Sequence, residues 1–204
     1  MGHKMQPIRD KGKVHDAEVI LSRMTDAHGR RMFLLWEIGI RLGMRVSDLV
    51  RLKVGDLVGK SSYTYLPQKQ SHKVRARPIT ITFDPKLKRI IQARLADRDP
   101  DEWVFPSRQR DITGALKPIT RQTARNDMRA IAQLCGLGDS VGCHTMRKTF
   151  GYHYYQKTRD IAFLQEWFYH ETPSTTLIYI GVNEDMMKKR TDMTPFDDLQ
   201  GVEL

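Results

Sequence analysis

Residues 143–181 contain four side chains that could act together on a phosphate group. His144 and Arg147 are three positions apart, so in a helix both side chains leave the same face. An arginine can bind phosphate through paired hydrogen bonds, and a histidine can give or take a proton near neutral pH. His170 and Tyr179 follow, nine positions apart. A tyrosine bracketed by cations and imidazoles could attack a phosphodiester through its phenol oxygen.

Each of these features also has an ordinary structural explanation. A His-x-x-Arg pair is usually a solvated helix face, and a tyrosine between Ile178 and Ile180 is typical of a core residue with a satisfied hydroxyl. A phenol of ordinary pKa, about 10, is ionised to only about one part in a thousand at neutral pH. Attack by Tyr179 therefore requires nearby cations that favour the phenolate and the charge of the transition state.

Two earlier segments supply further cations. Arg45 follows Gly43, a helix-ending residue, and Asp48 is placed to hold Arg45 by an ion pair or to form an ordinary surface Arg–Asp pair. Residues 69–77 contain no acid and four cations: Lys69, Lys73, Arg75 and Arg77. Such a loop could carry a lysine that protonates a leaving oxygen, or it could only add electrostatic attraction for DNA.

The composition favours a protein that binds a polyanion. The chain has 204 residues, a formal net charge of +10 and a pI of about 9.7. Its two cysteines are too few for a disulfide framework and form no zinc pattern, which indicates reduced thiols in a cytoplasmic protein. No apolar run is long enough to cross a membrane. A merely basic protein, such as a ribosomal one, is the alternative.

Hydrophobic periodicity predicts an α+β fold that is mostly α-helical, with one small antiparallel sheet. The two strands are expected between Ser62 and Phe83, joined by the basic loop Gln68–Pro78, and Pro106–Pro118 is expected to be a loop. The expected helices are His15–Asp26, Gly29–Leu42, Val46–Lys53, Pro85–Asp97, Thr120–Cys135, His144–Gln156, Asp160–His170, Ser174–Ile180 and Asn183–Arg190. The predicted organisation is an extension at 1–7, with 1–4 a candidate tag remnant, one domain at 8–190 and a tail at 191–204.

In their order and spacing, these motifs resemble the catalytic domain of the tyrosine recombinase (phage integrase) family. The segment GMRVSDL, residues 43–49, matches the family's G-x-R-x-x-E/D-L box and identifies Arg45 as the first catalytic arginine. The family's hairpin lysine matches Lys69 best and Lys73 second. The loop is one residue longer than the family's usual K-T-G-K form.

The later motifs of the family also have counterparts. His144 and Arg147 match its H-x-x-R box, and His170 precedes the nucleophile Tyr179 by the family's usual nine residues. Two positions outside the catalytic set depart from the family pattern: Tyr169 and Lys148. The first replaces the usual glycine, and the second replaces a residue that is often histidine.

The resemblance implies a site-specific recombinase that cuts and rejoins double-stranded DNA through a 3′-phosphotyrosyl link, without metal or cofactor. The arginines would bind the phosphate, Lys69 would be the general acid, and His144 and His170 would assist. Asp48 would support Arg45, and the DNA-binding residues would include Lys73, Arg75, Arg77 and Lys148.

The resemblance also implies partners and alternatives. Family members act as tetramers on DNA, with accessory bending or directionality proteins, although the free protein could be a monomer. Only 44 residues precede Arg45, so the chain is expected to be a short form without the family's N-terminal DNA-binding domain. The alternatives are a recombinase-fold regulator that binds DNA without cutting it, and a topoisomerase of the same chemistry.

Overall fold

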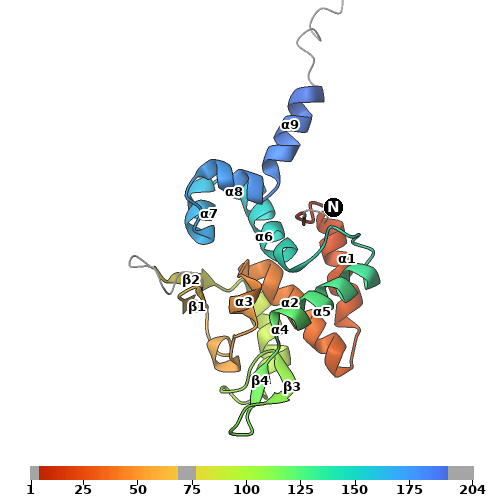
Figure 1. The fold of residues 1–204 in the computed structure, drawn as a ribbon, viewed down its shortest axis with the longest axis vertical. Helices are drawn as coiled ribbons and strands as arrows, with labels where there is room; N and C mark the ends of the chain where they lie inside the picture. The colour runs from red at the N-terminus through yellow and green to blue at the C-terminus, as the bar shows by residue number, and fades with distance from the viewer. Residues whose placement is uncertain (1–4, 69–76, 193–204) are drawn as a thin grey trace, which may run out of the picture. The chain divides into compact units, whose positions relative to one another are not determined.

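The computed structural model describes residues 5–68 and 77–192, which divide inside one helix into two compact units. The first unit ends at Phe150 and the second begins at Gly151. The elements of the first unit are α1 (Lys11–Ser22), α2 (Ala27–Leu42), α3 (Val46–Leu49), the short 3-10 helix η1 (Val54–Asp56), β1 (Ser62–Tyr65), β2 (Ile79–Thr82), α4 (Pro85–Leu95), β3 (Pro106–Arg110), β4 (Leu116–Pro118), α5 (Arg121–Leu134) and the start of α6 (Cys143–Thr158) (Figure 1). Those of the second unit are the end of α6, α7 (Ile161–Phe168), α8 (Pro173–Tyr179) and α9 (Val182–Asp192).

The mostly helical α+β fold class is confirmed, and no helix in the described ranges is long and apolar enough to span a membrane. Helix α2 is the most buried helix of the first unit. Its apolar residues recur at helical spacing, and Leu35, Trp36, Ile38 and Leu42 are each 0% exposed. The Asp26 carboxylate caps its N-terminus by accepting the Gly29 N–H at 3.1 Å.

Two glycines on α2 allow close contact with the start of α6. A Cβ atom at Gly39 would lie 2.2 Å from the Met146 sulfur, and one at Gly43 would lie 2.4 Å from the Phe150 ring. Gly43 also ends α2 in the left-handed conformation, with φ of +57°, which favours glycine. The two glycines therefore set how closely α6 approaches the residues that follow α2.

The hairpin predicted between Ser62 and Phe83 is confirmed. Strands β1 and β2 are antiparallel with Tyr63 opposite Ile81, and the inward-facing Tyr65 and Ile79 are buried. The tip of this hairpin, which carries Lys69, Lys73 and Arg75, lies outside the described residues, as do the candidate tag remnant at 1–4 and residues 193–204 of the expected tail.

The expectation of a loop at Pro106–Pro118 is wrong, because β3 and β4 form a second antiparallel hairpin. Its exposed, polar strands lack the apolar alternation that marks a half-buried strand. The turn is instead fixed by Asp111, whose carboxylate accepts the backbone N–H groups of Thr113 and Ala115 at 2.8 and 3.1 Å.

Two helices differ from expectation by four residues, α1 at both of its ends and α3 at its C-terminal end. Helix α1 begins four residues earlier, at Lys11, because the Asp10 carboxylate caps it by accepting the Gly12 N–H at 2.7 Å. Helix α3 ends at Leu49 rather than Lys53. The chain beyond it pairs with a distant segment, since Val104 N–H donates to the Leu52 carbonyl at 2.8 Å.

The second unit packs its helices around Gly151. A Cβ atom there would lie 2.6 Å from Ile180 and 2.7 Å from the Phe168 ring, and both of these side chains are 0% exposed. Thr172 caps α8 by accepting the Thr175 N–H at 3.1 Å, and the helix ends at Tyr179. The three short helices expected here are confirmed to within a few residues at their ends.

Candidate active site

Arg45 occupies the junction between α2 and α3. It is the residue before α3 and has an extended backbone, with φ of −68° and ψ of 144°. Gly43, two residues earlier, turns the chain through its left-handed conformation. The glycine therefore ends one helix and leaves Arg45 outside the regular turns of both. This is the physical basis of the Gly-x-Arg spacing in the sequence.

Arg147 is tied to the same junction from α6. Its Nη1 donates a hydrogen bond of 2.6 Å to the Gly43 carbonyl, and the residue is only 3% exposed. His144, one turn earlier on α6, is exposed. The (i, i+3) spacing does place His144 and Arg147 on one face of the helix, and Gly43 connects that face to the segment of Arg45.

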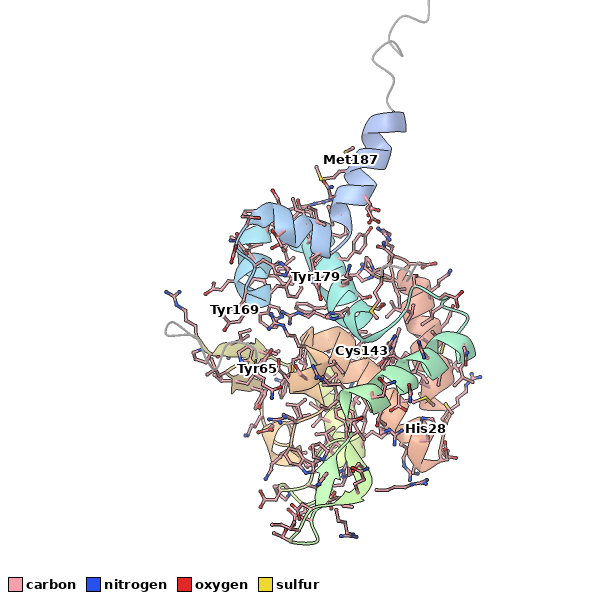
Figure 2. The ribbon with its side chains drawn as sticks, in the orientation of Figure 1. His28, Tyr65, Cys143, Tyr169, Tyr179 and Met187 are labelled. Atoms are coloured by element: carbon pink, nitrogen blue, oxygen red, sulfur yellow. The ribbon has the colours of Figure 1, made fainter. Side chains whose placement is uncertain are left out.

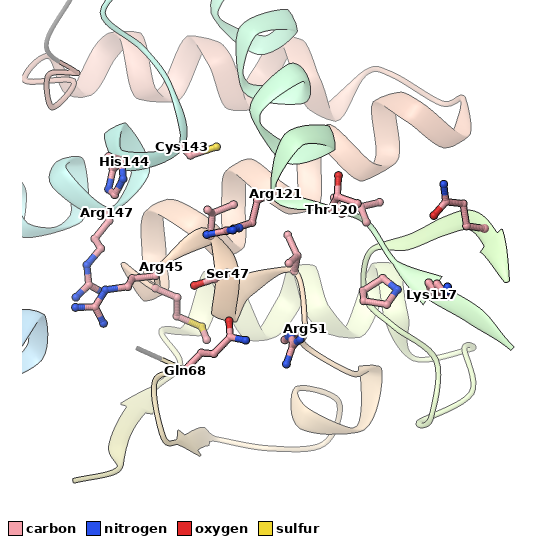
Figure 3. Close-up of a pocket in the computed structure, with 16 residues that line it drawn as sticks. Arg45, Ser47, Arg51, Gln68, Lys117, Thr120, Arg121, Cys143, His144 and Arg147 are labelled. Atoms are coloured by element: carbon pink, nitrogen blue, oxygen red, sulfur yellow. The ribbon is translucent and has the colours of Figure 1, made fainter. Parts of the chain in front are cut away.

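These three residues line one cavity of about 890 Å³ (Figure 3). The guanidinium groups of Arg45 and Arg147 extend to the same end of it, and His144 stands above Arg147. Further cations come from other elements: Arg51, Lys117 and Arg121. No carboxylate occurs among the described residues of the lining. A cavity with this charge suits a phosphate group of a nucleic acid.

Asp48 lies behind this cavity and is 8% exposed. Burial raises the pKa of its carboxyl, while the Gln68 N–H and the charges of Arg45 and Arg147 act in the opposite direction. Its Oδ1 accepts the Gln68 N–H at 3.0 Å. The carboxylate thus influences both arginines electrostatically and also holds the residue just before Lys69. The support of Arg45 by Asp48 stays a prediction, and the hydrogen bond to Gln68 links this carboxylate to the segment that precedes Lys69.

In the second unit, Tyr179 packs against two aromatic side chains. Its ring centroid is 5.0 Å from that of His170 and 5.2 Å from that of Phe168, both in edge-to-face geometry. The Nδ1 atom of His170 is 3.1 Å from Oγ1 of Thr176, which is fully buried and itself donates to the Thr172 carbonyl at 3.4 Å. This hydrogen bond fixes the orientation of the imidazole beside the phenol.

His170 follows a Schellman motif that ends α7. The His170 N–H donates to the Gln165 carbonyl and the Tyr169 N–H to the Glu166 carbonyl, each at 3.0 Å. Tyr169 adopts the left-handed conformation with φ of 55° and ψ of 45°. Glycine is the usual residue at this position, because it carries no Cβ penalty there. Tyr169, which replaces the family's usual glycine, therefore occupies a strained backbone position. Tyr169 and Tyr179 are labelled in Figure 2.

Of the predicted DNA-binding residues, the structure describes Arg77 and Lys148, and neither is among the described residues that line the cavity. Arg77 is exposed just before β2, whereas Lys148 is buried, at 7% exposure, and does not line the cavity. Sequence reasoning missed three lining cations: Arg51, Lys117 and Arg121. The acid-poor run of Lys117, Arg121, Arg125 and Arg129 was a signal that could have indicated two of them.

Cys143 begins α6 and also lines the cavity. Burial raises the pKa of its thiol, an effect that the charge of Arg125 opposes. The thiol is therefore mostly protonated at neutral pH, which makes it a poor nucleophile.

The sequence and the fold of this chain are both similar to those of known proteins. Residues 14–186 match the model of the phage integrase family. The chain is 38% identical over 183 residues to a probable integrase/recombinase, YoeC, of Bacillus subtilis, covering 90% of this chain and 93% of that protein. It is 27% identical over 195 residues to tyrosine recombinase XerD of Brucella melitensis, covering 91% of this chain and 61% of that protein.

Solved structures share the fold. The crystal structure of XerA recombinase gives a TM-score of 0.67 at 19% identity, covering 91% of this chain and 64% of that one. A post-cleavage complex of XerH site-specific recombinase with a palindromic difH substrate gives 0.65 at 18% identity, covering 95% of this chain and 54% of that one. The chain therefore spans roughly half to two thirds of these longer proteins, but nearly all of the Bacillus relative.

Proposed function

Because this chain belongs to the phage integrase family of tyrosine recombinases, we propose that it is a site-specific recombinase that cuts and rejoins double-stranded DNA through Tyr179. The observation that carries the proposal is the convergence of Arg45, His144 and Arg147 on one cavity lined by cations and polar groups. A cavity of this kind stabilises the negative charge that grows on a phosphate under attack.

In the proposed reaction, the Tyr179 Oη attacks the phosphorus of the scissile phosphodiester. A bond forms between Oη and phosphorus, the bond to the 5′-oxygen breaks, and a 3′-phosphotyrosyl link remains. His144 takes the phenol proton, and Lys69, or Lys73 as its alternative, gives a proton to the leaving 5′-oxygen. The 5′-hydroxyl of a partner strand then reverses these steps, so the bond energy is conserved and no nucleotide cofactor is consumed.

Arg45 and Arg147 neutralise the non-bridging oxygens during this attack. The Gly43 carbonyl holds Arg147 in place before DNA arrives, since it accepts the 2.6 Å hydrogen bond from Nη1. A preorganised donor of this kind typically lowers the activation barrier by about 2.7–4 kcal/mol. Removal of either guanidinium is therefore expected to slow cleavage by about a hundredfold or more.

His170 has a positioning role in this proposal. Its imidazole is held by Thr176 and packs on the ring of Tyr179, so it limits the orientations open to the phenol. The protein is proposed to act as a tetramer on two duplexes in the cytoplasm, with α9 as one contact between copies. The exposed Met186 and Met187 of that helix support such a contact.

The test uses duplexes that carry the repeats flanking the gene, each nicked on the 3′ side of a candidate scissile phosphate so that the cleaved fragment diffuses away. We expect the wild-type protein to accumulate a covalent protein–DNA complex on a denaturing gel, and Tyr179→Phe to form none. A complex formed by Tyr179→Phe would falsify the assignment of the nucleophile. Binding without any complex by the wild type would favour a regulator that does not cut.

A further inference from the structure

A second basic cavity, of about 820 Å³, lies next to the candidate active site. It is formed by the first half of α2, the end of α4 and its following segment, strand β3 and the start of α5. Three residues line both cavities: Gln109, Ile119 and Thr120. The two cavities therefore adjoin along β3 and the segment between β4 and α5.

The second cavity carries a large excess of positive charge. Its lining contains His28 and one carboxylate, Glu102, together with five arginines: Arg30, Arg31, Arg94, Arg98 and Arg108. Two of the arginines are neutralised, because Arg98 pairs with Glu102 at 2.9 Å and Arg31 pairs with Asp127 at 2.8 Å. Within the described part of the chain, no carboxylate lies within 4.0 Å of the other three. All three are exposed.

The wall of this cavity is rigidly built. Asp127 of α5 is 3% exposed and accepts two hydrogen bonds of 2.8 Å from Arg31 of α2. The same carboxylate is 2.9 Å from His28 Nε2, so α2 and α5 are joined where His28 lies beside α5 (Figure 2). Arg94 stacks on the Phe33 ring at 5.2 Å. Arg30 therefore comes from a helix that is joined to α5, and Arg94 is held against the Phe33 ring of that helix.

We infer that this second cavity binds the sugar–phosphate backbone of the same duplex that the candidate active site engages. Arg30, Arg94 and Arg108 come from three different elements, a spread that suits a run of phosphates better than one small anion. The wall that the two cavities share includes the polar side chains of Gln109 and Thr120. Because the cavities adjoin, one duplex can contact both of them through its phosphates.

This inference rests on the proposed function, since it requires DNA in the first cavity, but it assigns a site that the cutting reaction does not use. It also gives a physical answer to how a catalytic domain of this size holds a duplex. The second cavity supplies contacts to phosphate that carry no sequence information, so it contributes affinity and register rather than specificity.

The test measures binding rather than cutting, in a Tyr179→Phe background, by fluorescence anisotropy of a labelled duplex of unrelated sequence across a range of salt concentrations. The variant is Arg30→Ala with Arg108→Ala. If each arginine contacts one phosphate, the slope of log K against log salt becomes shallower by about 1.8, at about 0.9 per contact. The control, Lys88→Ala with Arg89→Ala, removes the same charge from exposed residues of α4 outside this cavity.

We expect the first double variant to bind more weakly with a shallower slope, by the same factor on two unrelated sequences, and the control to keep the parental slope. Equal slopes for both double variants would overturn the inference, because only the overall charge would then matter. A loss confined to one sequence would also overturn it, as that result indicates contacts to bases. Failure of the proposed function is a separate result, because it appears in the protein with Tyr179 intact, as the absence of a covalent complex on the nicked duplexes, and not in these salt slopes.

Discussion

Replacement of Tyr169 tests whether the departure from glycine strains the segment that positions His170. Tyr169 has φ of 55° in the Schellman motif that ends α7. A residue with a Cβ atom loses about 1–2 kcal/mol in this conformation, and glycine does not. Glycine also loses about 0.5–1 kcal/mol more backbone entropy on folding than alanine does. We therefore compare Tyr169→Gly with Tyr169→Ala, which both remove the side chain and differ only at Cβ.

The expected result is that Tyr169→Gly is more stable than Tyr169→Ala by about 0.8 kcal/mol, the difference between the midpoints of these two ranges. Urea unfolding followed by circular dichroism gives the global value, and hydrogen exchange of the α7 and α8 amides gives the local one. The matched control is Glu166, an exposed residue within α7, where Gly is expected to be less stable than Ala by about 1 kcal/mol. The same sign at both positions would refute the reasoning.

Three further predictions concern the first unit. Gly39→Ala is expected to lower the melting temperature, because the new Cβ atom would lie 2.2 Å from the Met146 sulfur and cost about 1–3 kcal/mol. Alanine normally stabilises a helix relative to glycine, so a rise in the melting temperature would contradict the close contact between α2 and Met146. Burial raises the pKa of Tyr63 to about 12. The contribution of Tyr63 to the free energy of unfolding is therefore complete below its unfolded pKa of about 10 and is lost as the pH rises through about 12. Tyr63→Phe is expected to reduce this alkaline loss in urea unfolding, and an unchanged pH profile contradicts the prediction. Burial raises the pKa of the Cys143 thiol, so in a Cys135→Ser protein iodoacetamide is expected to react more slowly than with a free cysteine at neutral pH, and a faster reaction contradicts this.

The sequence predicts those parts of the site that depend on local geometry. The turn after Gly43 places Arg45, and helical spacing places His144 beside Arg147, so both follow from short-range rules. The contact that links these two segments does not follow from short-range rules. It is a hydrogen bond from Arg147 to a carbonyl more than a hundred residues earlier, and no local pattern marks it.

The second cavity shows the same limit. Asp127 stands on α5 among exposed cations, and its sequence context is that of a surface residue, yet it is 3% exposed and joined to Arg31. Likewise the β3–β4 hairpin depends on the turn at Asp111 and on pairing with the core rather than on apolar alternation. In both cases tertiary contacts decide the structure, and these are invisible in composition and periodicity.

The most direct measurement of the central claim is to locate the DNA on the protein. The covalent complex formed on a nicked duplex is digested with nuclease and protease, and tandem mass spectrometry identifies the modified residue. The chain has seven tyrosines, and Tyr169 is close enough to Tyr179 to serve as an internal control within one peptide. We expect a nucleotide adduct on Tyr179 alone. An adduct on any other residue, or none in a preparation that cuts DNA, would contradict it.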